Sequence, residues 1–391
     1  MSIRPLTLIG IIISIVTGLS LGVLAFLHQQ AATPSPAEDT VRAALREVAN
    51  NYVEQISDQQ LTEYAIEGIM RGLDEHSDYL DPSSYQSLNT STTGKFGGIG
   101  IELGLVDDYF TVIAPIDDTP ASSAGLLAGD RIVGINGESA KGKKLSDVID
   151  ILRGAPGTTV TLSIESEAAP SREVELERAE IRIASVKSRM LAPGYGYLRI
   201  SQFQTSTGQD VAEHLEQLQD EHGGELEGLV LDLRNNPGGT LLSSVEVADH
   251  FLDSGTIVST AGRQPISEAK YAATRGDLLA GKPMVVLINS GSASASEIVA
   301  AALKDQQRAT IVGSTSYGKG SVQSVLPLDG AQALKLTTAY YYSPNGDTIH
   351  EIGVAPDIPL QLEEEALLDE AVTLLRGKQS EHLQARLPLG D

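Results

Sequence analysis

Residues 283–298 read PMVVLINSGSASASEI. The apolar run at 283–289 predicts a buried strand, and the alanine-rich segment at 294–306 predicts a helix. Between them, a glycine and several serines predict a sharp turn that places a serine at the helix N-terminus. Backbone amides there lack partners within the helix, and with the positive end of the helix dipole they stabilise a developing oxyanion. The stretch predicts an α/β fold that carries a candidate nucleophilic serine.

Three serines occupy this turn, and residue chemistry does not separate Ser292, Ser294 and Ser296. The segment 294–297 also fits a capping box, in which a serine hydroxyl merely satisfies the Glu297 amide. A serine nucleophile further needs a base that takes its proton. The turn alone therefore leaves both a nucleophile and an ordinary helix cap open.

A candidate base lies downstream, where residues 314–323 read STSYGKGSVQ. Lys319 stands between two glycines and leads into an apolar strand. A lysine acts as a base only when it is neutral, and burial among few carboxylates disfavours its charged form. The alternative is a surface lysine on a turn.

The rest of the chain alternates strands and helices. Apolar strands are predicted at 194–203, 226–233 and 309–312, with a polar amphipathic helix at 211–219. This order predicts an α/β core with crossover helices that cover the sheet faces. Two amphipathic helices are predicted within 38–73 and a further helix at 362–375.

A glycine-rich segment at 97–103 precedes an alternating strand. Free backbone amides in such a loop can receive a terminal carboxylate, and the strand edge can accept a peptide. Residues 120–137 end in an Asn-Gly hairpin signal, and 145–152 predicts a groove helix. The whole string resembles a PDZ domain, in which a peptide C-terminus adds a strand beside the groove helix. That resemblance implies a peptide-binding role for Gly97, Gly98, Ile99, Gly100, Ile101 and Leu103. The alternative is a loop that merely turns a β-structure.

Together these segments resemble the carboxyl-terminal processing proteases, also called tail-specific proteases. The resemblance covers nearly everything after residue 38 and includes LDLRNNPGG at 231–239, YGKG at 317–320, YSPNG at 342–346 and GVAPD at 353–357. It implies that Ser294 is the nucleophile, that Lys319 is the base and that Gln323 orients the base. It also implies a protease core of mixed β-sheet with ββα units of the crotonase and ClpP type, and no cofactor or metal.

Gln323 can serve the same site as Lys319 only under one condition. In a regular strand the two residues share a face but lie about 13 Å apart, so the glycines must bend the chain. The loop at 235–239 resembles the family's oxyanion loop, in which a Gly238 or Gly239 amide would join that of Ala295. The alternative for this loop is a tight strand-to-helix turn.

The N-terminus carries a membrane signal. Residues 6–27 form a run of 22 without a charged side chain, long enough as a helix to cross about 30 Å of hydrocarbon. Arg4 precedes the run and no Lys or Arg follows it until Arg42, which predicts export of the rest. We expect an uncleaved anchor rather than a cleaved signal peptide, and hence a periplasmic or other extracytoplasmic protein held at the inner membrane.

The expected organisation is a signal or anchor segment with linker (1–37), a helical region (38–93), a PDZ domain (94–170), a serine peptidase core (171–360) and a helical tail (361–391). The 391 residues carry a net charge of −24, which argues against nucleic acid as a partner. There is no cysteine, which excludes a cysteine nucleophile and thiolate metal sites. The expected partners are proteins with accessible C-terminal tails, and a homo-oligomer or adaptor stays open.

Parts of the sequence could fit three functions other than a Ser/Lys protease. Residues 313–319 fit the first seven places of a P-loop, but Gly320 stands where a Ser or Thr must hold magnesium, and a strand rather than a helix follows. A non-catalytic PDZ scaffold that binds tails is the second, although both Ser294 and Lys319 are present. A Ser-His-Asp triad is the third, although none of His214, His222, His250 and His350 lies in a recognisable catalytic turn.

Overall fold

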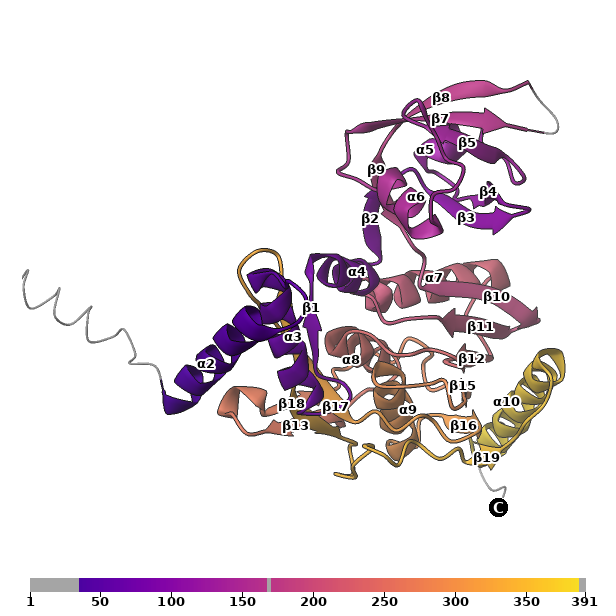
Figure 1. Cartoon of the computed structure of the whole chain (residues 1–391). Helices are drawn as coiled ribbons and strands as arrows, with labels where there is room; N and C mark the ends of the chain where they lie inside the picture. The colour runs from indigo at the N-terminus through magenta and orange to yellow at the C-terminus, as the bar shows by residue number, and fades with distance from the viewer. Residues whose placement is uncertain (1–34, 167–169, 387–391) are drawn as a thin grey trace, which may run out of the picture. The chain divides into compact units, whose positions relative to one another are not determined.

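The computed structural model describes residues 35–166 and 170–386, shown in Figure 1. It divides into one unit that ends at Glu75 and a second that begins at His76. The expected membrane anchor at residues 6–27 lies outside the described residues. Within the described ranges, no helix combines the length and the apolar character that crossing a bilayer requires.

The first unit contains the two helices expected within 38–73. They are α2 (Pro36–Asn51) and α3 (Asp58–Arg71). Each begins with a capping box, Ser35 with Glu38 and Ser57 with Gln60, which satisfies the otherwise unpaired amides of the first turn.

The second unit begins with β1 (Asp78–Leu80), α4 (Pro82–Thr93) and β2 (Lys95–Gly98), and then forms the PDZ domain. The domain's sheet runs in the order β3-β4-β5-β7-β8, with β6 paired to β5. The strands are β3 (Ile101–Val106), β4 (Tyr109–Pro115), β5 (Arg131–Ile135), β6 (Glu138–Ser139), β7 (Thr159–Glu165) and β8 (Arg172–Glu177), and the helices are α5 (Pro120–Ser123) and α6 (Leu145–Leu152).

Two local features of this domain follow from sequence. Asn136 and Gly137 both have positive φ, 51° and 79°, and form the expected tight turn between β5 and β6. The strands continue beyond the predicted boundary at residue 170, because β8 pairs with β7 along its length. β9 (Ala179–Arg182) then pairs antiparallel with β2. The chain therefore enters and leaves the domain through one two-stranded ribbon.

The large α/β core is built on a six-stranded sheet in the order β10-β11-β12-β15-β16-β19. Its first pair is antiparallel and the other pairs are parallel. The strands are β10 (Val186–Ala192), β11 (Tyr195–Ile200), β12 (Gly228–Asp232), β15 (Met284–Ile288), β16 (Thr310–Gly313) and β19 (Ile358–Pro359). This confirms the mixed sheet with crossover helices predicted from the sequence.

Helices cover both faces of this sheet (Figure 1). On one face lie α7 (Thr207–His222), α8 (Leu241–Asp249) and α9 (Ala295–Asp305). On the other face lies α10 (Glu364–Arg386), whose Leu368 and Leu375 pack with Val230 and Val285. The strand pleat explains the division, since neighbouring residues of β12 and β15 point to opposite layers. The helix expected as a C-terminal tail is therefore a layer of the core.

A second sheet completes the unit. Its strands run β1-β18-β13-β14, with β17 paired to β18. They are β13 (Thr256–Gly262), β14 (Ala269–Ala272), β17 (Ser321–Pro327) and β18 (Ala333–Tyr342), with a short 3₁₀ helix at Pro265–Ser267. β17 begins directly after the turn that carries Lys319, so this sheet brings that turn to the start of α9.

Candidate active site

Ser294 precedes the first residue of α9 and has a strained backbone. Its φ is 56° and its ψ is −113°, a conformation that side-chain-bearing residues rarely adopt. A sharp strand-to-helix turn holds a serine hydroxyl exposed in the nucleophile elbow of α/β-hydrolases. Ser294 lines a pocket of about 370 Å³, while the serines on either side of it do not.

The neighbouring serines have other partners. Ser292 is fully buried and its hydroxyl donates to the Leu233 carbonyl oxygen at 2.8 Å. Ser296 is also fully buried and donates to the Asn236 carbonyl oxygen at 3.0 Å. Both hydroxyls therefore fasten the turn to the loop that follows β12. The three serines that the sequence left equivalent are distinguished by their surroundings.

Glu297 connects the serine turn to the lysine turn. Its side chain is fully buried, and its two carboxylate oxygens accept four hydrogen bonds. Oε2 accepts from the amides of Ser294 at 2.8 Å and Lys319 at 2.9 Å. Oε1 accepts from the Ser316 hydroxyl at 2.6 Å and the Gly318 amide at 2.7 Å. The sequence indicated Glu297 only as a helix cap, and its second set of donors comes from a turn 19 to 22 residues away in the chain.

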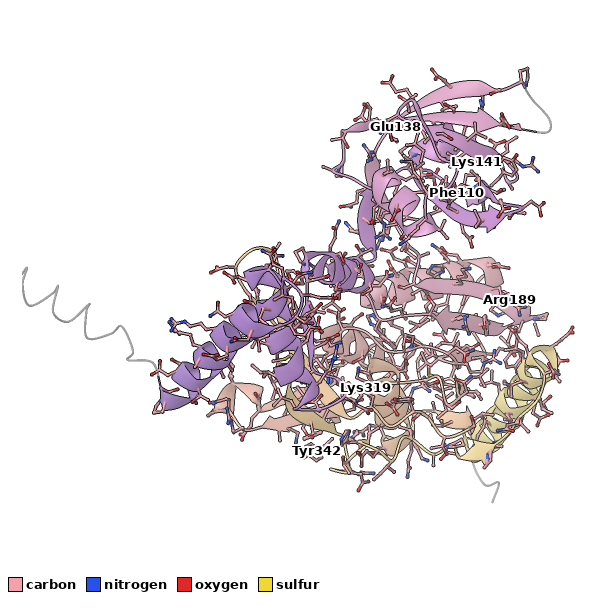
Figure 2. The ribbon with its side chains drawn as sticks, viewed as in Figure 1. Phe110, Glu138, Lys141, Arg189, Lys319 and Tyr342 are labelled. Atoms are coloured by element: carbon pink, nitrogen blue, oxygen red, sulfur yellow. The ribbon has the colours of Figure 1, made fainter. Side chains whose placement is uncertain are left out.

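Lys319 and Gln323 line the same pocket as Ser294. Between these two residues the pairing of β17 shifts register, at Val322 and Gln323. Gly318, which precedes Lys319, has a φ of 96°. The Gln323 amide nitrogen donates to the Ser321 hydroxyl at 2.9 Å and lies 3.4 Å from that of Thr337. Lys319 is labelled in Figure 2, where it lies in the α/β core.

Tyr341 lines this pocket as well, a residue that the sequence analysis did not single out. It is 1% exposed, and its hydroxyl donates to the Lys319 carbonyl oxygen. Burial, aided by the negative charge of Glu297, raises the pKa of Tyr341 well above its usual value, although the Ser294 hydroxyl acts in the opposite sense. The phenol therefore stays protonated and remains a donor.

The oxyanion candidates are placed differently from one another. Gly239 and Ala295 line the pocket. The Gly238 amide instead donates to Asn236 Oδ1 at 2.9 Å. A side chain at Gly238 would lie 2.8 Å from the Cβ of Ser294, so glycine permits the close approach of this loop. Of the two glycine amides left open by the sequence, only that of Gly239 belongs to a pocket-lining residue in this structure.

A buried ionic cluster supports the same loop. Asp232 ends β12 with no exposed side-chain surface and accepts from Tyr197 at 2.8 Å, Arg199 at 3.1 Å and Arg234 at 2.7 Å. Burial opposes ionisation, but the hydrogen bonds and charge of Arg234 outweigh it and lower the pKa of Asp232. Burial and the Asp232 charge raise the pKa of Tyr197 to about 12. The sequence analysis did not single out this cluster. Its signal in the sequence is a charged residue, Asp232, at the end of an apolar strand and two residues before Arg234.

The PDZ domain has a groove between β3 and α6. It is lined by Gly98, Ile99, Gly100, Ile101 and Leu103 together with Phe96, Ile149, Leu152 and Arg153. Gly97 is absent from this lining, because it pairs with Glu180 of β9 and its carbonyl accepts from the Gly154 amide at 3.1 Å. Phe110 and Lys141, labelled in Figure 2, identify the domain in the view.

The structure bears on two of the alternative functions, the P-loop NTPase and the Ser-His-Asp hydrolase. The glycine-rich stretch at 313–320 runs into strand β17 rather than opening a helix, which a P-loop requires. The pocket around Ser294 has no histidine among its described lining residues. Within the described ranges, no cluster of three or more His, Cys, Asp or Glu side chains is arranged to hold a metal ion.

Comparison with known proteins gives consistent matches. The family model described as Peptidase family S41 matches residues 194–360, and that of the PDZ domain matches residues 111–166. The chain is 42% identical over 358 residues to a carboxy-terminal-processing protease of Bartonella bacilliformis, covering 90% of this chain and 82% of that protein. It is 34% identical over 381 residues to the carboxy-terminal processing protease CtpB of Bacillus subtilis, covering 89% and 78%. A solved photosystem II D1 C-terminal processing protease is 31% identical, with 88% and 97% coverage and a TM-score of 0.49.

The family models and these relatives identify a serine-type peptidase that carries a PDZ domain. Within that class, the chain belongs to the carboxy-terminal processing proteases of peptidase family S41.

Proposed function

We propose that this peptidase cleaves proteins near their C-terminus, with Ser294 as nucleophile and Lys319 as general base. The observation that carries the assignment is the contrast among the three serines. Ser292 and Ser296 are buried and donate to backbone carbonyls, whereas Ser294 lines the pocket that Lys319 also lines. The pocket contains both parts that a serine nucleophile needs, a hydroxyl at a helix N-terminus and an amine.

The proposed chemistry runs in two halves. Neutral Lys319 takes the proton of the Ser294 hydroxyl as Oγ attacks the scissile carbonyl carbon. The negative oxygen of the tetrahedral intermediate accepts hydrogen bonds from the backbone amides of Ala295 and Gly239. The protonated lysine then gives its proton to the leaving amine, and an acyl-enzyme remains. Water attacks the ester carbonyl while Lys319 accepts a proton from it. Lys319 returns this proton to Ser294 Oγ as the ester bond breaks, and the second product leaves as a carboxylic acid.

A second lysine in the pocket is the main internal rival. Lys335 also lines the pocket, but its amine lies 3.9 Å from the Asp78 carboxylate. An amine paired with a carboxylate is a poor proton acceptor. Lys319, whose amide donates to the Glu297 carboxylate that also binds the Ser294 amide, is our proposed base. Gln323, which lines the same pocket, is our proposed orienting residue.

Substrate recognition is proposed to involve the PDZ groove. Its lining is mostly apolar, with Arg153 after the end of α6 and glycines in the loop before β3. A peptide tail can add as a strand beside β3, with its carboxylate at that loop.

We further propose that the enzyme acts outside the cytoplasm, because residues 6–27 carry the features of an uncleaved anchor and the charge bias of an exported protein.

The test compares lysines and serines within one pocket. Purified variants Ser294→Ala, Ser296→Ala, Lys319→Ala and Lys335→Ala are incubated with an unstructured protein tail, and the products are mapped by mass spectrometry. We expect kcat to fall by at least about a thousandfold for Ser294→Ala and Lys319→Ala only. Parental turnover by either of these two variants, or loss of turnover in Lys335→Ala alone, would show that the dyad is assigned to the wrong residues.

The alternative of a non-catalytic tail-binding scaffold makes a different prediction. Such a protein would bind the tail and release it intact, whatever residue stands at position 294. The mapped products of the parental protein decide between the two functions.

A further inference from the structure

Arg178 lies between β8 and β9 and is a buried arginine, 9% exposed. Its guanidinium makes four hydrogen bonds, all to neutral oxygens. Nη2 donates to the Ile151 carbonyl at 2.8 Å and Nε to the Leu152 carbonyl at 3.2 Å. Nη1 donates to the Thr159 carbonyl at 2.8 Å and to the Thr158 hydroxyl at 3.0 Å. None of these four acceptors is a carboxylate.

Two of these acceptors belong to the last turn of the groove helix. The final carbonyls of a helix have no partner within it, and a cation there also interacts favourably with the helix dipole. Arg178 supplies both the donors and the charge at the end of α6. The residues of that end, Leu152 and Arg153, line the groove.

The chain that leaves α6 is enclosed on two sides. A side chain at Gly154 would lie 2.9 Å from the Cδ and Nε atoms of Arg178. A side chain at Gly97 would lie 2.0 Å from the Gly154 carbonyl oxygen. Residue 154 therefore passes between the guanidinium and strand β2. The backbone of Arg178 adds a further tie, since its amide donates to the Thr158 carbonyl at 2.7 Å and its carbonyl accepts from Gly157 at 2.8 Å.

We propose that Arg178 is a positioning residue for peptide recognition. It touches no substrate, but it fixes the C-terminal end of α6 relative to β7 and to the β2–β9 ribbon. The separation between that helix and β3 sets the width of the groove, so this anchor holds the wall that a tail strand packs against. The proposal rests on the proposed function, because it assumes that the groove binds substrate tails.

Binding is measured on full-length protein that carries Ser294→Ala, so that the tail is not consumed. A fluorescent tail peptide with a free C-terminus is titrated, and its amidated twin is titrated in parallel. In the Arg178→Ala variant we expect the Kd for the free tail to rise about tenfold, the cost of losing the anchoring hydrogen bonds. Arg178→Lys keeps the positive charge but places it on a single nitrogen. We expect its Kd for the free tail to lie between those of the parent and of Arg178→Ala.

The matched control is Arg172→Ala in the same domain. The Arg172 guanidinium also donates to a backbone carbonyl, that of Gly125 at 2.7 Å, but it lies on β8 away from the groove lining. The Kd of the Arg172→Ala variant for the free tail should equal that of the parent. With Ser294 restored, Arg178→Ala should raise KM for the long tail while kcat stays unchanged. Amide hydrogen exchange at 149–154 should become faster in the Arg178 variants and not in the control.

The outcomes are separable. A parental protein that binds free and amidated tails equally well would contradict the proposed use of the groove. A parent that prefers the free tail, with Arg178 variants that bind it equally tightly, would overturn the role of Arg178 alone. Faster exchange at the helix end without a change in Kd would make Arg178 a stabiliser of the fold only. Unfolding of both Arg178 variants would lead to the same conclusion and would also overturn the proposal.

Discussion

Glu297 illustrates how one side chain organises a reaction centre that is divided in sequence. A buried carboxylate is stable only when its oxygens are satisfied, and here the donors come from two separate turns. Because both turns must be in place for the carboxylate to be satisfied, the residue ties the position of Ser294 to that of Lys319. The strain in the Ser294 backbone is sustained by the same contacts.

Glu297→Gln should therefore reduce activity strongly while leaving most of the fold intact. The amide NH₂ group would face two donors where an oxygen accepted two hydrogen bonds, so the two turns would separate. We expect kcat to fall by at least about a hundredfold, as for loss of a group that preorganises an oxyanion site. Steady-state kinetics on a tail substrate measures this, with Glu370→Gln on the exposed side of α10 as control. Activity within about twofold of the parent would contradict the organising role of Glu297.

The residue scale also marks the limit of sequence reasoning. The turn at 290–298 and the lysine between glycines were predictable, because a strand-to-helix junction and a glycine-flanked bend have local signatures. The choice among Ser292, Ser294 and Ser296 was not, because it depends on Leu233 and Asn236, nearly 60 residues earlier in the chain. Tyr341 gave no signal either, since its contact with Lys319 arises from the pairing of β17 with β18.

At the scale of elements, β12 and the loop after it depend on the buried Asp232 cluster. Two arginines and a tyrosine surround one carboxylate at the end of the strand. Removal of one partner of a buried pair leaves an uncompensated charge. The loop at 235–239, which supplies Gly239 to the pocket, follows directly from this cluster.

Asp232→Asn should lower the free energy of unfolding by about 3 kcal/mol at pH 7. The pKa of Asp232 is lowered from its ordinary value of 3.8, so its stabilising contribution is fully present above that value. It is lost as the pH falls through the lower pKa of the folded state. Urea unfolding of both proteins at several pH values should show a constant difference down to about pH 5 that shrinks below about pH 4. A difference that stays constant to pH 2, or none at pH 7, would be inconsistent with this ionic cluster.

Element types were largely predictable, whereas their layering was not. The strands at 226–233 and 283–289 and the helix at 294–306 match β12, β15 and α9. The helix at the C-terminus was recognised but taken for a tail, because its amphipathic pattern does not reveal which surface it covers. Leu375 is fully buried against the second face of the sheet, a contact that only the tertiary structure specifies.

On the scale of the whole molecule, two modules divide the work. One has a groove with apolar walls and a glycine loop, and the other has a pocket with a serine and a lysine. If the groove binds tails as proposed, the binding energy gained there lowers the concentration of tail needed for cleavage without changing the chemical step.

A competing tail should therefore inhibit cleavage only when its carboxylate is free. A short peptide that ends in an apolar residue and has no scissile bond is added to a cleavage reaction. We expect an increase in the apparent KM for the protein tail with kcat unchanged, and no effect from the amidated peptide. Equal inhibition by both peptides would indicate that the groove does not read the carboxylate.

The central claim is that the Ser294 hydroxyl attacks the substrate with help from Lys319. The most direct measurement is the site of covalent modification by a serine-reactive phosphonate, located by mass spectrometry of the digested full-length protein. We expect one adduct, on Ser294, that forms at least about a hundredfold more slowly in Lys319→Ala and at the parental rate in Lys335→Ala. An adduct on Ser292 or Ser296, or equal rates of labelling with and without the Lys319 amine, would contradict it.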